Sequence, residues 1–201
     1  LMAQQSENSE ILLALKQIIN NCCFDDLDVN QLATFDLEYV FLQIRAKSVG
    51  EVSQVKLRCP DDNETFVKTE IDLTEVEVKM DEEHTNKIEL TEEMGMIMTY
   101  PNLDSFADYD VTNINASNMI DMIASCIAQI YDKKGEDVYD SKDSTHKELV
   151  DFIEQLNSKQ FAEVQKFFDT MPKLTHTVTI ENPKTKKKSE IVLSGLNDFF
   201  V

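Results

Sequence analysis

Cys59 is the residue whose surroundings come closest to a known chemical site. It opens the run Cys59–Asn63, in which a proline and two aspartates follow the cysteine between two predicted strands. A zinc knuckle needs two thiolates two to four residues apart, so that both reach one tetrahedral ion. Here Asp62 and Asn63 stand where the second sulfur would be, and one thiolate beside hard oxygens makes a poor zinc site. We interpret the run as a degenerate zinc-knuckle-like hairpin turn and predict no metal and no cofactor.

The other residues that could do chemistry form no recognisable catalytic pattern. The histidines, His84, His146 and His176, lie far apart and in no metal-ligand spacing. There is no P-loop, no glycine-rich dinucleotide fingerprint and no nucleophile elbow. The sequence therefore predicts a protein that is not an enzyme and has no small-molecule substrate. A metal- or thiol-dependent enzyme that pairs Cys59 with a histidine remains the alternative.

The composition excludes several classes of partner. The 201 residues carry 19 basic and 38 acidic side chains, for a net charge of −19. Nucleic-acid binding depends on neutralising phosphates with lysine and arginine, so we predict no nucleic-acid partner and no anionic membrane surface. No apolar run is long enough to span a bilayer. The scattered cysteines do not resemble a disulfide framework and favour a reducing compartment.

Two predicted β-hairpins carry the most distinctive turns. Residues 36–73 are predicted to form a short helix, a basic loop ending at Gly50 and a hairpin with strands over 52–57 and 66–71. A second hairpin over 175–181 and 189–193 turns at Asn182–Thr185 and repeats the order strand, X-Pro turn and polar return strand.

The remaining segments predict a helical core and a third strand pair. Apolar spacing predicts helices over 10–20 and 115–131, the second central to the core. Thr145 and Glu148 form a capping-box motif, and Asn157 with Gln160 can cap the helix after it. An antiparallel pair is expected over 86–90 and 94–100. The predicted class is α+β, in segments 1–33 (N-terminal helical), 34–110 (helix plus antiparallel β module) and 111–201 (helical core with C-terminal hairpin).

Three positive or apolar sites are the predicted partner-binding surfaces, because they contrast with an otherwise acidic chain. One is the Arg45–Glu51 loop, the second is the tip of the second hairpin and the third is the C-terminal apolar tail. Removal of residues 196–201 is expected to weaken binding and leave the fold intact. The residues predicted to make these contacts are Arg45, Lys47, Lys184, Lys186, Lys187, Lys188, Phe199 and Phe200.

Several of these segments together resemble a known family. The pattern of Ile11–Cys22, Asp36–Tyr39, Arg45–Glu51 and Cys59-Pro60, with the closing Leu193–Phe200, is similar to the baseplate hub (assembly) proteins of T-even-type contractile-tailed bacteriophages. The resemblance spans nearly the whole chain. Members of that family often carry Cys-X-X-Cys knuckles in these hairpins, whereas this chain keeps only Cys59 in the first hairpin and no cysteine in the second.

The resemblance implies a role in assembly and no catalysis. The protein would be made late in infection in the host cytoplasm and would bind other baseplate hub or tail proteins. It would then remain in the virion tail baseplate. The alternative is a transient assembly chaperone that masks a hub subunit and is absent from the virion.

Overall fold

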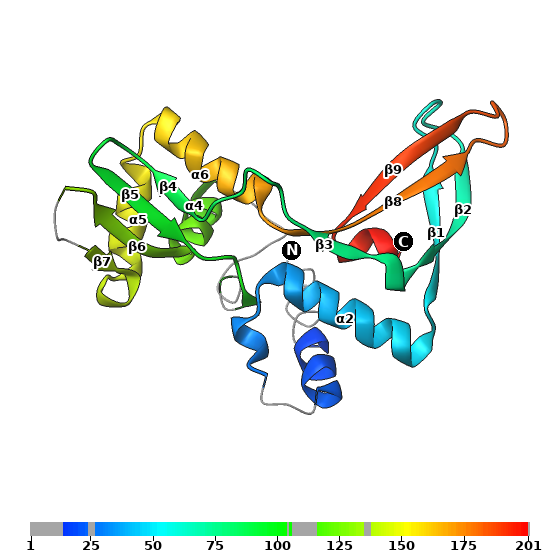
Figure 1. Cartoon of the computed structure of the whole chain (residues 1–201), viewed down its shortest axis with the longest axis horizontal. Coiled ribbons are helices and arrows are strands. Elements are labelled where there is room, and N and C mark those ends of the chain that lie inside the picture. The colour runs from blue at the N-terminus through cyan, green and yellow to red at the C-terminus, as the bar shows by residue number, and fades with distance from the viewer. Residues whose placement is uncertain (1–13, 24–26, 104, 106–115, 135–137, 201) are drawn as a thin grey trace. The chain divides into compact units, whose positions relative to one another are not determined.

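The computed structural model describes residues 14–23, 27–103, 105, 116–134 and 138–200 (Figure 1). They form an α+β fold, as the sequence predicts. The chain divides into two compact units, with residues 1–17, 28–34 and 80–171 in unit 1 and residues 18–27, 35–79 and 172–201 in unit 2. These segments alternate along the chain, unlike the predicted consecutive ones, because the last hairpin pairs with strand β3 (Glu77–Lys79), which precedes the main segment of unit 1.

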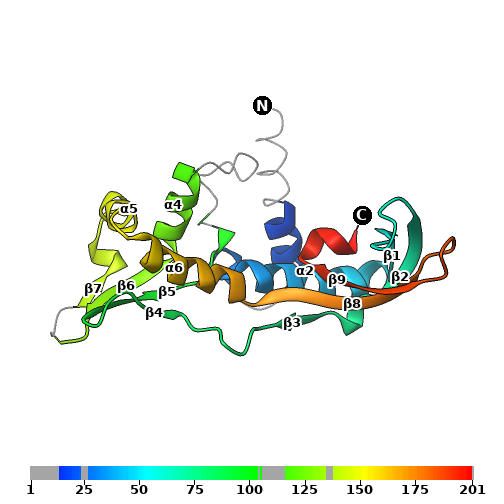
Figure 2. The same ribbon diagram turned by 90° about the horizontal axis from the view of Figure 1, so that it is seen from above.

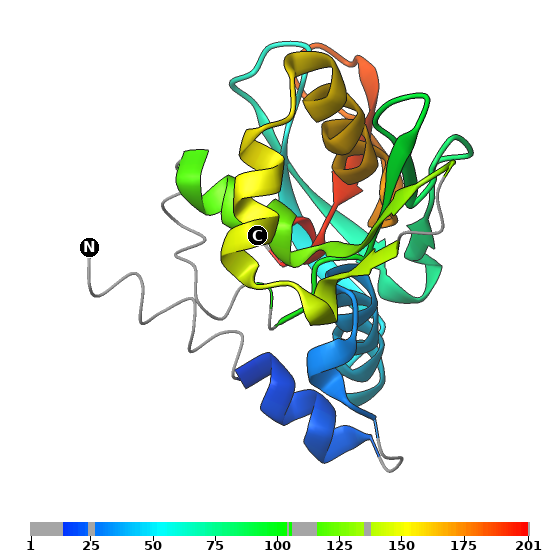
Figure 3. The same ribbon diagram turned by 90° about the vertical axis from the view of Figure 1, so that its left-hand side faces the viewer.

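Unit 1 contains a four-stranded antiparallel sheet with helices on one face (Figures 2 and 3). The strands pair in the order β4 (Lys87–Glu89), β5 (Met94–Met98), β6 (Ile127–Asp132) and β7 (Val138–Asp140). The helices are α4 (Ala116–Ser125), α5 (His146–Glu154) and α6 (Ser158–Thr170), and the short turns are η1 (Val29–Gln31) and η3 (Ser141–Asp143). The predicted pair over 86–90 and 94–100 is confirmed as β4 and β5.

Cross-strand register builds the core of unit 1. Ile88 lies opposite Met96, which lies opposite Ile130, so one apolar row faces the helices. The helices contribute the other half of this apolar cluster. Its buried residues are Ile88, Leu90, Met96, Met98, Ile123, Ala124, Cys126, Ile127, Leu149, Ile153, Val164 and Phe167.

The helix predicted over 115–131 is wrong in its second half. Helix α4 ends at Ser125, whose hydroxyl donates to the carbonyl of Met122 at 2.7 Å, and the chain turns at Cys126 into β6. Isoleucine and tyrosine favour strands, and pairing with β5 buries the residues that a helical stripe would otherwise present. Tertiary pairing therefore overrides an apolar spacing that suits a helix equally well.

The predicted helix starts are confirmed at two caps. Thr145 and Glu148 form a complete capping box at α5, and Asn157 and Gln160 form another at α6. The predicted helix over 10–20 is present as a helix over residues 14–22, and residues 1–13 lie outside the described part. Among the described helices, none has the length and apolarity needed to cross a membrane.

Unit 2 is built from one long helix and two hairpins (Figure 1). Helix α2 (Thr34–Val49) belongs to this unit from Phe35 onward. Strands β1 (Val52–Arg58) and β2 (Phe66–Asp72) form one sheet, and β3 (Glu77–Lys79), β8 (Lys173–Glu181) and β9 (Lys188–Ser194) form the other. The short turns are η2 (Leu73–Glu75) and η4 (Leu196–Phe199). Both predicted hairpins are confirmed.

The core of unit 2 joins the helix, both hairpins and the tail. Alternation along β1 and β2 sends Val55 and Ile71 inward, where each is 2% exposed or less. The buried residues of this core are Leu42, Ala46, Val55, Ile71, Leu73, Val76, Leu174, Val178, Leu193 and Phe199.

Candidate interaction surfaces

The tips of the two hairpins in unit 2 have the same backbone geometry. In the first tip, the amide of Asn63 donates to the carbonyl of Cys59 at 2.9 Å, and in the second the amide of Lys186 donates to the carbonyl of Asn182, also at 2.9 Å. The fifth residue of each tip has a positive φ, 55° at Asn63 and 61° at Lys186. A proline follows the first residue in both. The sequence similarity of the two hairpins is thus matched in their structures.

A network of side chains joins the two tips, and we call it the tip clasp: Asp61, Asp62, Asn182 and Thr185. The amide Nδ2 of Asn182 donates to Asp61 Oδ1 at 3.0 Å and to Asp62 Oδ2 at 3.0 Å. The hydroxyl of Thr185 donates to Asp61 Oδ2 at 2.5 Å. Asn182 is only 1% exposed. Its Oδ1 accepts the amide of Lys184, which fixes the orientation of the side-chain amide.

The tip clasp keeps its carboxylates ionised. Hydrogen bonds from Asn182 and then from Thr185 lower the pKa of Asp61. The pKa of Asp62 lies well below its usual range because the hydroxyl and amide of Thr65 and the side chain of Asn182 all donate to it. An ionised aspartate only accepts hydrogen bonds, so Asp61 and Asp62 can both accept bonds from side chains of the second tip.

Cys59 lies beneath these carboxylates and is 1% exposed. Burial raises the pKa of its thiol, and the negative charges of Asp61 and Asp62 raise it further. Burial likewise raises the pKa of Cys126 to about 12. Both thiols are held protonated, whereas nucleophilic and metal-bound sulfur is thiolate. Within the described residues no group of histidine, cysteine and carboxylate side chains could hold a metal ion.

The lysines predicted at the second hairpin lie where expected. Lys184, Lys186 and Lys187 are in the turn between β8 and β9, and Lys188 opens β9; all are exposed. Four other lysines in the described part form ion pairs with glutamates. No such pair is found for the four tip lysines among the described residues, so their charges face solvent.

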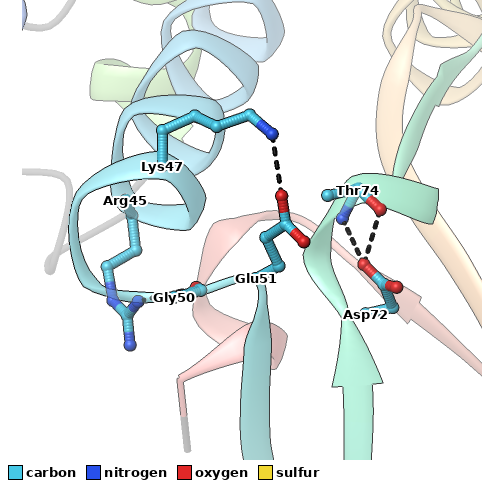
Figure 4. A network of polar contacts seen from close by, with 6 residues as sticks. All are labelled: Arg45, Lys47, Gly50, Glu51, Asp72 and Thr74. Atoms are coloured by element: carbon cyan, nitrogen blue, oxygen red, sulfur yellow. Dashed lines mark hydrogen bonds and ion pairs between the residues drawn. The ribbon is translucent and has the colours of Figure 1, made fainter.

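Arg45 and Lys47 lie within α2, Lys47 in its last turn, and the predicted loop placement is wrong (Figure 4). Alanine, arginine and lysine favour helix, so the helix continues to Val49 and ends where Gly50 adopts a φ of 138°. Arg45 Nη1 donates to the carbonyl of Gly50 at 3.1 Å, and Lys47 Nζ lies 2.8 Å from Glu51 Oε1. The pair with Glu51 raises the pKa of Lys47. Both cations are already engaged in ending the helix.

The carboxylate of Asp72 begins the next turn beside this helix end (Figure 4). Its Oδ1 accepts the amide of Thr74 at 2.9 Å and the hydroxyl of Thr74 at 2.6 Å, which lowers the pKa of Asp72. These contacts make Asp72 the local cap of η2.

The two aromatic residues of the tail have different environments. Phe199 is fully buried in the core of unit 2, and its carbonyl accepts a 2.7 Å hydrogen bond from the buried hydroxyl of Ser53. Its predicted role as a surface contact is therefore wrong, because η4 folds the tail back onto β1. Phe200 is 40% exposed and meets Phe41 edge-on, with ring centroids 6.3 Å apart. Of the two, only Phe200 is accessible.

The ring of His84 in unit 1 contacts two hydroxyl groups and two aromatic rings. Its Nδ1 lies 2.9 Å from Thr170 Oγ1 and its Nε2 lies 2.9 Å from the Tyr100 hydroxyl. The ring stacks on Tyr100 and tilts against Phe167. Burial lowers the pKa of His84, which favours the neutral ring. Both nitrogens are thus occupied by hydroxyl groups, as in a structural histidine.

A groove of about 660 Å³ runs between β4 and α6 in unit 1. Its floor includes Ile88 and Phe167, and its rim carries both glutamate and lysine. Lys166 Nζ pairs with Glu83 Oε2 at 3.1 Å across this rim. Because glutamates and lysines both line the groove, its charge does not indicate which class of ligand would bind there.

One basic surface was not predicted from the sequence. Lys56, Arg58, Phe66 and Lys68 come together on the exposed side of β1 and β2. Their period-2 spacing was the available signal, since it places all four on the face opposite Val55.

Comparison with known proteins gives one match. Searches of curated proteins and of solved structures find no similar protein. A family model described as "T4 bacteriophage base plate protein" matches residues 1–201. The match covers both units and every surface described above, and the chain belongs to the T4 bacteriophage base plate protein family.

Proposed function

We propose that this chain is a non-catalytic component of the baseplate hub that binds other hub proteins. In this proposal it is made late in infection, assembles in the host cytoplasm and remains in the virion. The observation that carries the proposal is the set of exposed tip lysines, Lys184 and Lys186–Lys188, which form no ion pair in the described part of a chain whose net charge is −19. Exposed cations in an acidic protein give an acidic neighbour a defined orientation.

Two features support binding rather than chemistry. The thiol of Cys59 is buried with a raised pKa, which weighs against an enzyme that uses this cysteine. The tip clasp holds the two hairpins together, so the lysines are presented on a rigid support. A preorganised surface loses less conformational entropy when a partner binds.

Quantitative mass spectrometry of purified tails tests the proposal. A fixed stoichiometric amount of the chain in the particle is expected. Its presence during assembly and absence from finished tails would instead identify a transient chaperone that masks a hub subunit.

A pair of matched variants tests the lysines. Lys186→Gln with Lys187→Gln is expected to reduce incorporation into baseplates several-fold. Lys142→Gln with Lys147→Gln removes the same charge from exposed residues of unit 1 and is the control. Equal incorporation of the two double variants would refute a role for the hairpin tip.

A further inference from the structure

The outer face of the first hairpin carries three cations, and two of them contact one exposed aromatic ring. Lys56 Nζ lies 4.9 Å from the ring centroid of Phe66, and Arg58 Cζ lies 5.5 Å from it. Phe66 is 46% exposed, although it is a large apolar residue. We call Lys56, Arg58, Phe66 and Lys68 the cationic face.

The register of the hairpin places two of these cations in opposition. Lys56 pairs directly with Lys68 across the strands, and Arg58 pairs with Phe66. Like charges directly opposite each other destabilise a sheet. With 38 acidic and 19 basic residues available, a carboxylate at either position would be the stabilising choice. Lys56 contacts the ring of Phe66, which favours a cation at that position. No ion pair or ring contact is found for Lys68 among the described residues, so the second lysine opposite Lys56 is the feature that folding alone does not explain.

No carboxylate among the described residues forms an ion pair with the three cations of this face. The nearest acidic position on the same side, Glu70, accepts a hydrogen bond from Gln54 Nε2 at 3.1 Å. Lys56, Arg58 and Lys68 form no ion pair with any described residue. The three cations of this face can therefore accept carboxylates from a partner.

We propose that the cationic face binds an acidic segment of a neighbouring baseplate protein, with Phe66 as the apolar anchor. The argument is one of charge complementarity, and aromatic and arginine side chains are the residues that dominate interface energetics. DNA is disfavoured because a net charge of −19 repels a polyanion over the rest of the molecule. The inference rests on the proposed baseplate role and adds the chemistry of the partner.

Photo-crosslinking tests the site directly. The chain is produced during infection with p-benzoylphenylalanine in place of Phe66, baseplates are purified and illuminated, and the crosslinked peptide is identified. A crosslink to a segment of another protein in which carboxylates outnumber cations is expected. A crosslink to DNA, to a second copy of this chain or to a segment without excess carboxylates would overturn the proposal, as would its absence. If the chain is missing from the particles, the proposed function fails instead.

Charge-reversal variants separate binding from folding. Lys56→Glu and Lys68→Glu each replace the like-charge pair with an opposite-charge pair. Lys68→Glu keeps the contacts of Lys56 and Arg58 with Phe66, so its melting temperature should be unchanged or higher, whereas Lys56→Glu also loses the Lys56 contact with that ring. Incorporation into baseplates should nevertheless fall at least fivefold. Lys142→Glu makes the same charge change in unit 1 and should incorporate normally. Normal incorporation of both hairpin variants would overturn the proposal.

Discussion

The side-chain amide of Asn182 donates to the carboxylate of Asp62, with Nδ2 3.0 Å from Oδ2, and joins two hairpin tips that are 120 residues apart in sequence. The two tips have the same i+4 amide-to-carbonyl bond and the same positive φ at their fifth residue. In a zinc ribbon an ion would hold such a pair together. Here charge-assisted hydrogen bonds connect them.

Asn182→Ala should loosen the tip clasp. Asn182 is 1% exposed, and its side-chain amide donates hydrogen bonds to the carboxylates of Asp61 and Asp62. The alanine variant has no donor in its place. A bond to a charged group contributes about 1.5–3 kcal/mol, and we expect a loss of about 2 kcal/mol in the free energy of unfolding. Urea denaturation measures this loss. Asn197→Ala, at an exposed position in η4, should change it by less than about 0.5 kcal/mol.

Acid should weaken the same clasp. Asn182 and Thr185 lower the pKa of Asp61, and Thr65 and Asn182 lower that of Asp62, both from an unfolded value of 3.8. A carboxyl group with a lowered folded pKa contributes stability that is present above the unfolded pKa and lost as pH falls through the folded pKa. The melting temperature of the parent protein should therefore decrease as the pH is lowered below about 4.

The clasp variant supplies the comparison for this titration. In Asn182→Ala the pKa of Asp61 loses the main bond that lowers it, so the decline of melting temperature between pH 5 and pH 2.5 should be shallower than in the parent. Parallel curves for the two proteins would contradict the assignment of acid sensitivity to the clasp.

The shared tip geometry should accept a metal ion when given the right ligands. Cys59, Asp62, Asn182 and Thr185 occupy the first and fourth positions of the two tips. Replacement of the last three by cysteine creates two pairs of thiolates, and within each pair two residues separate the cysteines. One zinc ion per chain is expected by mass spectrometry, with a melting temperature that drops when a chelator is added. The parent protein, which has only Cys59 of these four thiols, is the control, and no zinc should bind to it.

The local elements could be predicted from the sequence where a turn or cap fixes them. Both hairpins, the β4–β5 pair and the capping boxes at Thr145 and Asn157 depend on residues within a few positions of each other. The segment 115–131 could not be assigned correctly, because isoleucines at helical spacing also suit a strand, and pairing with β5 decides between the two.

The candidate surfaces were predictable to a smaller degree. Exposed lysines at a hairpin tip follow from the turn residues alone. The burial of Phe199 depends on η4 folding back onto β1, and the tip clasp depends on a contact across 120 residues of sequence. The cationic face needed the strand register, since only the opposition of Lys56 and Lys68 marks it as unusual. A contact across 120 residues, such as the tip clasp, leaves no local signal in the sequence, whereas the alternation along β1 and β2 does indicate the cationic face.

The tail provides a prediction that contrasts two neighbouring residues. Phe199 is 0% exposed in the core of unit 2, and its truncation to alanine should cost about 3–5 kcal/mol. Phe200 is 40% exposed and loses only an edge-to-face contact with Phe41, so Phe200→Ala should cost about 1 kcal/mol. Chemical denaturation of both variants measures the difference.

The burial of Phe199 changes the result expected when the tail is removed. The sequence alone predicts that the fold stays intact. Deletion of residues 196–201 takes away Phe199 and opens the apolar core of unit 2 to which it belongs, so loss of soluble protein is expected in place of an intact fold. Phe200→Ala, by comparison, should express and melt nearly as the parent does, and any defect in baseplate incorporation would then report on binding. A soluble deletion variant with the parent's melting temperature would show that Phe199 does not support the core, because a buried phenylalanine cannot be removed without a measurable loss of stability.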